Sequence, residues 1–143
     1  MPQIAFHFNA PDKLSYACRL LRKASTSGST VAVLGAAPWL NQLDLLLWRF
    51  SDLDFVPHGR VGIMAEQDLA QTGIWLCESA MQGQGRQVLV NFTADMPTHL
   101  DGYERVIEVV TENETDRQQA RARWRRYTEL GHEIVRHDLN LNS

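Results

Sequence analysis

The sequence predicts a layered α/β domain with a mostly parallel sheet. Short apolar segments alternate along the chain with segments of helical periodicity, and residues 30–35 are hydrophobic almost throughout, as in a strand buried on both faces. Strands that alternate with helices pair in parallel through right-handed crossovers. The chain has 143 residues, 44% of them hydrophobic, which suits a single domain over residues 1–143 with a sizeable core.

The first part of the chain reads as strand, helix, strand, helix. Residues 3–8 predict a short strand, and Pro11 begins a helix that extends to about residue 25. After the strand at 30–35, Pro38 lies in the first turn of a second helix, where the missing amide hydrogen of proline is not needed. Periodicity places one stripe of this second helix in the core: Trp39, Leu40, Leu43, Leu46, Leu47 and Phe50.

The second part of the chain begins with a predicted loop over residues 59–73. Apolar runs then predict three strands, at residues 74–77, 87–92 and 105–110. The last helix covers about residues 114–130 and stops at Gly131, because glycine is a favoured helix terminator. Thr111 and Glu114 have the spacing of a capping box. The polar, alternating residues after Gly131 are assigned no element.

Trp48 is the residue of the second helix that does not fit its core stripe. Periodicity places it on the opposite side of the helix. Its neighbours there are Asn41, Asp44 and Leu45. An exposed tryptophan, followed after a polar turn by Phe55, Val56 and Pro57, predicts an apolar patch that serves as a docking surface. The alternative is that residues 59–73 or a sheet edge fold over Trp48 within the monomer.

The last helix carries an aromatic and basic stripe. Its members are Arg117, Arg121, Trp124, Arg125 and Thr128, and a neighbouring core face holds Ala120, Tyr127 and Leu130. Arginines that flank a tryptophan suit an acidic peptide with an apolar or aromatic end. The alternative is a solvated basic face, since acidic residues near the helix start and arginines in its later turns complement the helix dipole.

Motifs for catalysis or cofactor binding are not evident in the sequence. The net charge of −3 argues against a general nucleic-acid coat protein, because such proteins need a basic surface. The segment after residue 35, Ala36-Ala37-Pro38-Trp39-Leu40, lacks the glycines and lysine of a phosphate-binding loop. We therefore expect no nucleotide or other cofactor and no stand-alone enzyme activity, although a triad built from distant positions leaves a small α/β enzyme open as an alternative.

Metal, disulfide and membrane features are equally sparse. The histidines are dispersed in sequence without metal-ligand spacing, so we expect no metal site and no catalytic residue: His7, His58, His99, His132 and His137. The two cysteines, Cys18 and Cys77, are expected to pack in the core. No signal peptide or membrane span is evident, which predicts a cytoplasmic protein that does not contact a membrane.

Two blocks of the chain resemble the chi subunit of bacterial DNA polymerase III holoenzyme. The first is Leu47-Trp48, a polar spacer, and Phe55-Val56-Pro57-His58; the second is Ala120-Arg121-Ala122-Arg123-Trp124-Arg125-Arg126-Tyr127, followed by Gly131. The order and spacing of these blocks fit the family, and the order of strands and helices fits over nearly the whole chain. The chain departs from the family at His132, where an aromatic residue is usual.

The resemblance implies a Rossmann-like, three-layer fold without a phosphate-binding loop, and two partners. Chi subunits bind the acidic C-terminal tail of single-stranded DNA-binding protein, which ends in a hydrophobic residue. This role carries over onto Val110, Arg117, Arg121, Trp124 and Arg125. The psi subunit, which links chi to the clamp loader, is expected at Trp48, Phe55, Val56, Pro57 and His58.

The function implied by the resemblance is a non-catalytic adaptor of the replicative polymerase assembly. We expect a monomer or a 1:1 heterodimer with psi, or with a protein that replaces psi, and only indirect contact with DNA. Direct binding of single-stranded nucleic acid through the arginine-rich helix is the alternative, which the acidic charge balance disfavours.

Overall fold

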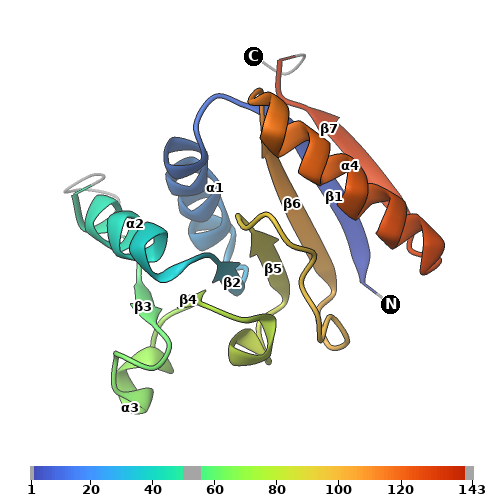
Figure 1. The fold of residues 1–143 in the computed structure, drawn as a ribbon. Helices are drawn as coiled ribbons and strands as arrows, with labels where there is room; N and C mark the ends of the chain where they lie inside the picture. Colours follow the sequence, from blue (N-terminus) through green and yellow to red (C-terminus); the bar gives the residue numbers. More distant parts are fainter. Residues whose placement is uncertain (1, 50–55, 141–143) are drawn as a thin grey trace.

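A computed structural model describes residues 2–49 and 56–140, which form a sheet of seven parallel strands with helices on both faces (Figure 1). The strands are β1 (Gln3–Ala10), β2 (Val31–Leu34), β3 (His58–Arg60), β4 (Ile74–Cys77), β5 (Val88–Asn91), β6 (Arg105–Thr111) and β7 (Ile134–Asp138). The helices are α1 (Lys13–Ser27), α2 (Ala37–Arg49), α3 (Glu66–Leu69), the 3-10 helix η1 (Ala80–Gly83) and α4 (Glu114–Glu129). The predicted single α/β domain of Rossmann type is confirmed.

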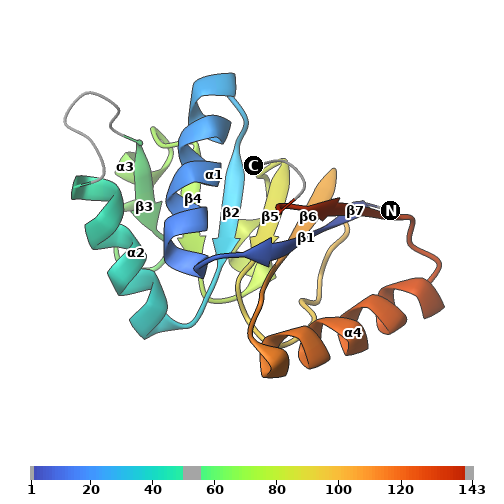
Figure 2. The same ribbon diagram turned by 90° about the horizontal axis from the view of Figure 1, so that it is seen from above.

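The strand order in the sheet is β3-β4-β2-β5-β6-β1-β7. The chain therefore enters near one edge of the sheet, crosses through α1 to its middle, and returns through α4 to form the outer strand β7. Helices α1 and α2 lie on one face of the sheet and α4 lies on the other (Figure 2). This three-layer arrangement buries both faces of the central strands, which explains why their sequences are apolar almost throughout.

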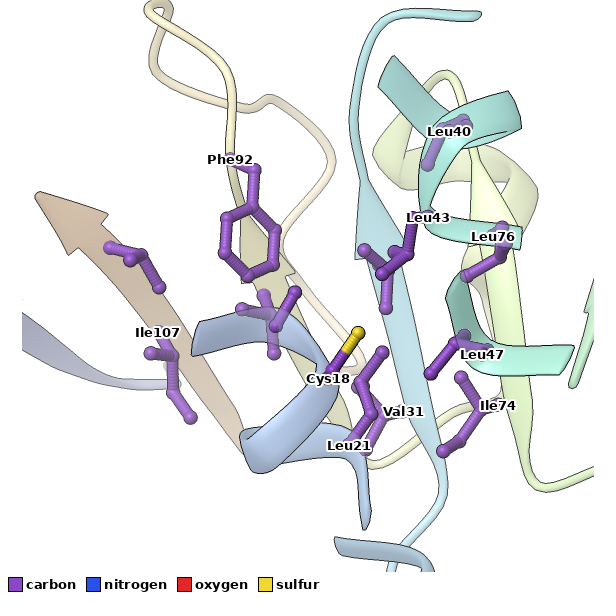
Figure 3. Packing of buried hydrophobic residues seen from close by; sticks show 14 of the residues in the cluster. Cys18, Leu21, Val31, Leu40, Leu43, Leu47, Ile74, Leu76, Phe92 and Ile107 are labelled. Atoms are coloured by element: carbon purple, nitrogen blue, oxygen red, sulfur yellow. The ribbon is translucent and has the colours of Figure 1, made fainter. Parts of the chain in front are cut away.

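The core is divided by the sheet into two clusters. On the α1 side, Cys18 and Leu21 of α1 and Leu43 of α2 pack against Val31 and Ile107 of the sheet (Figure 3). The cluster on the α4 side consists of Ile4, Phe6, Ala32, Leu34, Cys77, Ala80, Leu89, Leu100, Tyr103, Val106, Val110, Ala120 and Tyr127. Both cysteines are buried and free, as predicted. Burial raises the pKa of the Cys77 thiol to about 12.

Two parts of the predicted secondary structure are wrong, and one strand has no sequence-based prediction. The expected loop at residues 59–73 contains the end of β3 and the helix α3, and the tail after Gly131, to which the sequence assigns no element, forms β7. The capping box is also wrong, because Asn113 caps α4 by accepting a hydrogen bond from the Asp116 amide at 3.0 Å. Thr111 instead donates its amide and hydroxyl hydrogens to the Asp116 carboxylate. Strands of three to five residues are short, so they give little periodic signal.

Helix α2 uses a narrower core stripe than its sequence suggests. Leu40, Leu43 and Leu47 are fully buried, whereas Leu46, expected in the core, is 39% exposed. Trp39 is half-buried and stacks on Phe92 with ring centroids 4.7 Å apart. The stripe is narrow because α2 packs beside α1 near one edge of the sheet, so only one side of the helix meets other elements. Phe50 lies outside the described residues.

Candidate functional site

A groove lies between α4 and the outer strands β1 and β7, and we refer to it as the α4 groove. Its volume is about 510 Å³. It is lined by Phe8, Arg117, Ala120, Arg121, Trp124, Arg125 and Arg136. Four of these residues are arginines, and no aspartate or glutamate occurs among the described residues that line it. The groove is therefore basic, although the chain as a whole carries a net charge of −3.

The orientation of α4 determines which of its residues face the groove. Ala120, Arg123 and Tyr127 are buried against the sheet. Residues three and four positions apart lie on the same face of a helix, so the row Arg117, Arg121 and Arg125 runs beside this buried face. All three arginines are exposed. Leu130, expected on the core face, is 44% exposed because the helix ends at Glu129.

Aromatic side chains form the floor of the α4 groove. Trp124 is half-buried, and its ring lies 5.0 Å from the ring of Phe6 and 6.0 Å from the ring of Phe8, measured between centroids. The guanidinium of Arg136 lies over the other half-buried ring, Phe8, at 4.8 Å from its centroid. Offset and tilted aromatic contacts of this kind stabilise a fixed arrangement of rings. The floor is therefore a rigid apolar surface with basic residues along its sides.

The electrostatic environment of the arginines is open to solvent. Arg121 lies 3.7 Å from the carboxylate of Glu114, and both side chains are more than half exposed. Exposed ion pairs contribute about 0–1 kcal/mol. Because this internal pair is weak, the Arg121 guanidinium can exchange Glu114 for another carboxylate at little cost.

A buried polar network holds α4 against the sheet beneath the groove. The carboxylate of Glu108 on β6 is fully buried and accepts hydrogen bonds from Arg123 Nε (2.9 Å), Tyr127 Oη (2.7 Å) and Asn91 Nδ2 (2.9 Å). Burial raises the pKa of Glu108 to about 7, and the charge of Arg123 and these hydrogen bonds oppose the rise. Arg123 also donates to the Ala94 carbonyl oxygen at 2.8 Å. The network fixes the rotation of α4 about its axis and so the direction of its arginines.

The structure brings four of the five residues predicted for the peptide site into one groove: Arg117, Arg121, Trp124 and Arg125. Val110, the fifth, is fully buried in the cluster that contains Ala120, so it lies beneath the groove instead of lining it. Sequence reasoning missed Phe8 and Arg136. The alternation of residues 134–138 is the signal that could have identified β7 and its groove-facing arginine.

The second predicted surface surrounds Trp48. This side chain is 54% exposed, as its helical position predicted, and Leu45 beside it is also 54% exposed. The Trp48 ring contacts the His58 ring edge-on at 5.4 Å between centroids. Together Leu45, Leu46 and Trp48 form an exposed apolar ridge on α2, which we call the α2 ridge.

The other residues predicted beside Trp48 differ in exposure. Val56 is 1% exposed and belongs to the core, and His58 is 2% exposed. The ring nitrogens of His58 lie 2.6 Å from the Val56 carbonyl oxygen and 2.8 Å from the Asp44 carboxylate. The buried side chains of Val56 and His58 therefore support the α2 ridge from within the protein. Pro57, by contrast, is exposed. Phe55 lies outside the described residues.

The crevice at the carboxyl ends of β1 and β6, where α1 and α4 begin on opposite faces, is the usual ligand position in such sheets. Here the Asp12 side chain accepts from the Ser15 amide at 2.9 Å, and Asn113 caps α4. Lys13 and Asp116 form an ion pair across the crevice at 3.2 Å. One amide at the start of each helix and the ammonium of Lys13 are thus engaged by the chain itself.

The described residues, 2–49 and 56–140, contain neither a candidate metal cluster nor a helix suited to a membrane. In these ranges, no group of three or more His, Cys, Asp or Glu side chains is placed to hold a metal ion. Within the same part of the chain, no helix combines the length and the apolar character needed to cross a membrane.

Comparison with known proteins adds a family and a fold relative. The sequence model described as "DNA polymerase III chi subunit, HolC" matches residues 1–135. The chain is 34% identical to the DNA polymerase III subunit chi of Pseudomonas aeruginosa over 128 residues, which are 89% of this chain and 87% of that protein. Among solved structures, the C-terminal domain of the DEAD-box protein Dbp5 has a similar fold, with a TM-score of 0.63 over 98% of this chain and 91% of that one. At 11% identity the likeness concerns the fold alone.

Proposed function

The chain belongs to the DNA polymerase III chi subunit family, an accessory subunit of the polymerase complex, and from this we propose that it is a non-catalytic adaptor. It joins the polymerase assembly to DNA coated by single-stranded DNA-binding protein, by binding the acidic C-terminal tail of that protein in the α4 groove. Replication of the chromosome takes place in the cytoplasm of bacteria, and the proposed role places the protein there.

The observation that carries this proposal is the combination of arginines and exposed aromatic surface in the α4 groove. An acidic peptide with an apolar end needs both features at one site, and four arginines line the groove around Trp124 and Phe8. The row from Arg117 to Arg125 spans about 12 Å at the helical rise per residue. An extended peptide covers that length with about four residues. The row of arginines is therefore long enough to contact about four residues of an extended peptide tail.

Individual roles follow from the chemistry of the side chains. Arg121, in the middle of the row, holds the terminal carboxylate of the tail with its forked donors, since its pair with Glu114 is weak. Trp124 and Phe8 receive the apolar terminal side chain. The remaining arginines, Arg117, Arg125 and Arg136, attract the acidic residues, and Val110 supports the floor from beneath through the cluster with Ala120.

The affinity is expected to be moderate and sensitive to salt. Each charged contact at an exposed site contributes about 0–1 kcal/mol, so the apolar end of the tail must supply much of the binding free energy. A dissociation constant in the micromolar range, rising as salt is added, is the expected consequence.

The α2 ridge is proposed to bind the psi subunit, or a protein that replaces it, in a 1:1 complex. Large exposed aromatic side chains commonly provide much of the binding free energy of an interface. Trp48 and Phe55 are the proposed anchors and Pro57 a neighbouring contact, while Val56 and His58 hold the ridge in position from the core. Because α2 and α4 lie on opposite faces of the sheet, both partners can be bound at once (Figure 2).

Calorimetric titration with a peptide that copies the acidic tail tests the proposal. Arg121→Ala should lower the affinity by about 1–3 kcal/mol, because a charge-assisted pair to the carboxylate is lost. Arg126→Ala is the matched control: Arg126 is an exposed arginine of the same helix that pairs with Glu129 and does not line the groove. Amidating the C-terminus of the peptide should weaken binding as Arg121→Ala does. The two changes together should reduce the binding free energy by less than the sum of their separate effects.

Equal dissociation constants for Arg121→Ala and the parent would remove Arg121 from the site. Binding of a single-stranded oligonucleotide that is stronger than binding of the peptide, and lost in the same variant, would favour the direct nucleic-acid binder instead.

A further inference from the structure

A second cavity lies on the face of the sheet opposite the α4 groove, between α1 and the strands of the sheet. Its volume is about 490 Å³, within the range of about 300–1,000 Å³ that is usual for small-molecule sites. We call it the α1 cavity. Its lining comes from α1, β1, β2, β5, β6, the end of β7 and the turn after α1. Neither the proposed tail site nor the α2 ridge shares a residue with it.

The floor of the α1 cavity is apolar. Leu21 of α1, Val31 of β2 and Ile107 of β6 line it, each of them at most 2% exposed (Figure 3). Half-buried apolar side chains continue this surface toward solvent: Leu20, Ala24, Val88 and Leu139. The cavity therefore offers an apolar surface to the body of a ligand, open at the rim.

The rim of the α1 cavity carries cationic and imidazole groups. Lys23 of α1 and Arg105 of β6 are both exposed there. His7 and His137 are paired in register on β1 and β7, and their ring centroids lie 4.9 Å apart. The Tyr16 hydroxyl lies 2.5 Å from His7 Nδ1. Cationic and hydrogen-bonding side chains thus line the rim of an otherwise apolar cavity.

The charged residues that line the described part of the α1 cavity are all basic. Among the described residues that line it, none is aspartate or glutamate, although the chain has 17 of these residues against 14 lysines and arginines. The same imbalance acts on His7. The pKa of His7 is lowered from 6.5 to about 4, first by burial and then by the nearby His137, Arg105 and Lys23. The described lining of the cavity therefore favours a negatively charged ligand.

We propose that the α1 cavity binds a small organic anion, with its apolar body between α1 and the sheet and its carboxylate or phosphate between Lys23 and Arg105. His7, His137 and Tyr16 line the same cavity and offer the ligand further polar contacts. The basic side chains of the rim favour an anion, and the small apolar floor favours a compact ligand. A nucleic-acid strand is a poor fit, because it needs a longer row of basic residues. The site is independent of the proposed adaptor role.

Titration of the full chain, monitored by amide NMR shifts, tests this assignment with three probes that share one apolar body: sodium octanoate, octyl phosphate and neutral 1-octanol. The two anions should give saturable shifts confined to residues that line the α1 cavity, and octanol should bind at least about tenfold more weakly. The tighter of the two anions identifies the preferred head group. The amides of α4 should not move, which separates this site from the α4 groove.

Variants of the exposed rim provide the control. Lys23→Ala and Arg105→Ala should each weaken octanoate binding about three- to fivefold, as expected for one exposed charge. Arg22→Ala, which removes a charge from the adjacent position of α1 outside the cavity lining, should leave the affinity unchanged. Equal affinity for octanol and octanoate, or unchanged octanoate affinity in both rim variants, would overturn the proposal.

Discussion

The guanidinium of Arg136 lies over the ring of Phe8, with 4.8 Å between Cζ and the ring centroid. The two residues belong to β7 and β1, which pair in parallel from Ile4 and Ile134 to Phe8 and Asp138. This contact completes the α4 groove on the side away from the helix. The strand that follows Gly131 thus contributes a basic residue and an aromatic contact to a site that otherwise belongs to α4.

Removal of the Arg136 side chain should weaken tail binding without unfolding the protein. Arg136→Ala removes one exposed charge, worth about 0.5–1 kcal/mol to tail binding, so the affinity should fall about twofold to fivefold. The cation–π contact with Phe8 lies within the chain, so its loss affects mainly the stability of the groove. Arg136→Lys should retain most of the affinity, because the charge remains. Calorimetry with the tail peptide measures both, and identical affinity for parent and alanine variant would exclude β7 from the site.

Of the two tryptophans on α2, Trp48 should matter for binding psi and Trp39 for the stability of the fold. Trp48→Ala removes an exposed anchor and should weaken psi binding by about 2 kcal/mol or more, with little change in thermal midpoint. Trp39→Ala removes a half-buried ring stacked on Phe92 and should lower the free energy of unfolding by about 3 kcal/mol. Thermal unfolding and a binding assay with psi separate the two effects.

Tail-peptide affinity is the further control for Trp48. The α2 ridge and the α4 groove lie on opposite faces of the sheet, so Trp48→Ala should bind the peptide as the parent does. A folded Trp48→Ala variant that has lost the peptide would mean that the two surfaces are one, and a bridge between two partners could not be maintained.

Glu108 should make stability fall as pH rises from weakly acidic to neutral. The folded chain holds the Glu108 proton up to a pKa of about 7, whereas the unfolded chain releases it near 4.5. Between these two pH values the folded state binds more protons than the unfolded state. The contribution of Glu108 to the free energy of unfolding is therefore complete below pH 4.5 and is lost as the pH rises past 7. The full effect corresponds to about 3 kcal/mol.

Glu108→Gln isolates this effect, because an amide of the same shape does not titrate. His7 makes the free energy of unfolding rise with pH between pH 4 and 6.5, because its pKa is lowered on folding. This effect is the same in parent and variant, so it cancels when the two are compared at each pH. Urea unfolding at several pH values should show the parent losing stability relative to Glu108→Gln as pH rises. Parallel profiles would mean that Glu108 does not titrate in this window.

The cap of α4 should contribute measurable stability. Asn113→Ala removes the side-chain oxygen that accepts from the Asp116 amide and should cost about 1 kcal/mol, whereas Asn113→Gly should cost only a few tenths. Urea unfolding of both variants tests this difference. An Asn113→Ala variant as stable as the parent would show that the Asp116 amide is equally well satisfied by water.

Local periodicity by itself determined much of this protein. Continuous apolar runs are sufficient to identify central parallel strands, because both of their faces are buried. The spacing of Arg117, Arg121 and Arg125 places them on one face of any helix, and the spacing of Trp48 from Leu40 and Leu47 excludes it from the core stripe. These features depend only on residues within a few turns of one another, so sequence patterns report them directly.

Tertiary structure decided the features that depend on distant neighbours. β7 is half-buried and five residues long, and its position comes from hydrogen bonding to β1 at the other end of the chain. Only that pairing brings Arg136 to Phe8 and His137 to His7. Likewise, Val56 and His58 are buried because β3 inserts beside β4 beneath α2. Strand pairing joins segments far apart in sequence, so no local pattern records which side chains it makes neighbours.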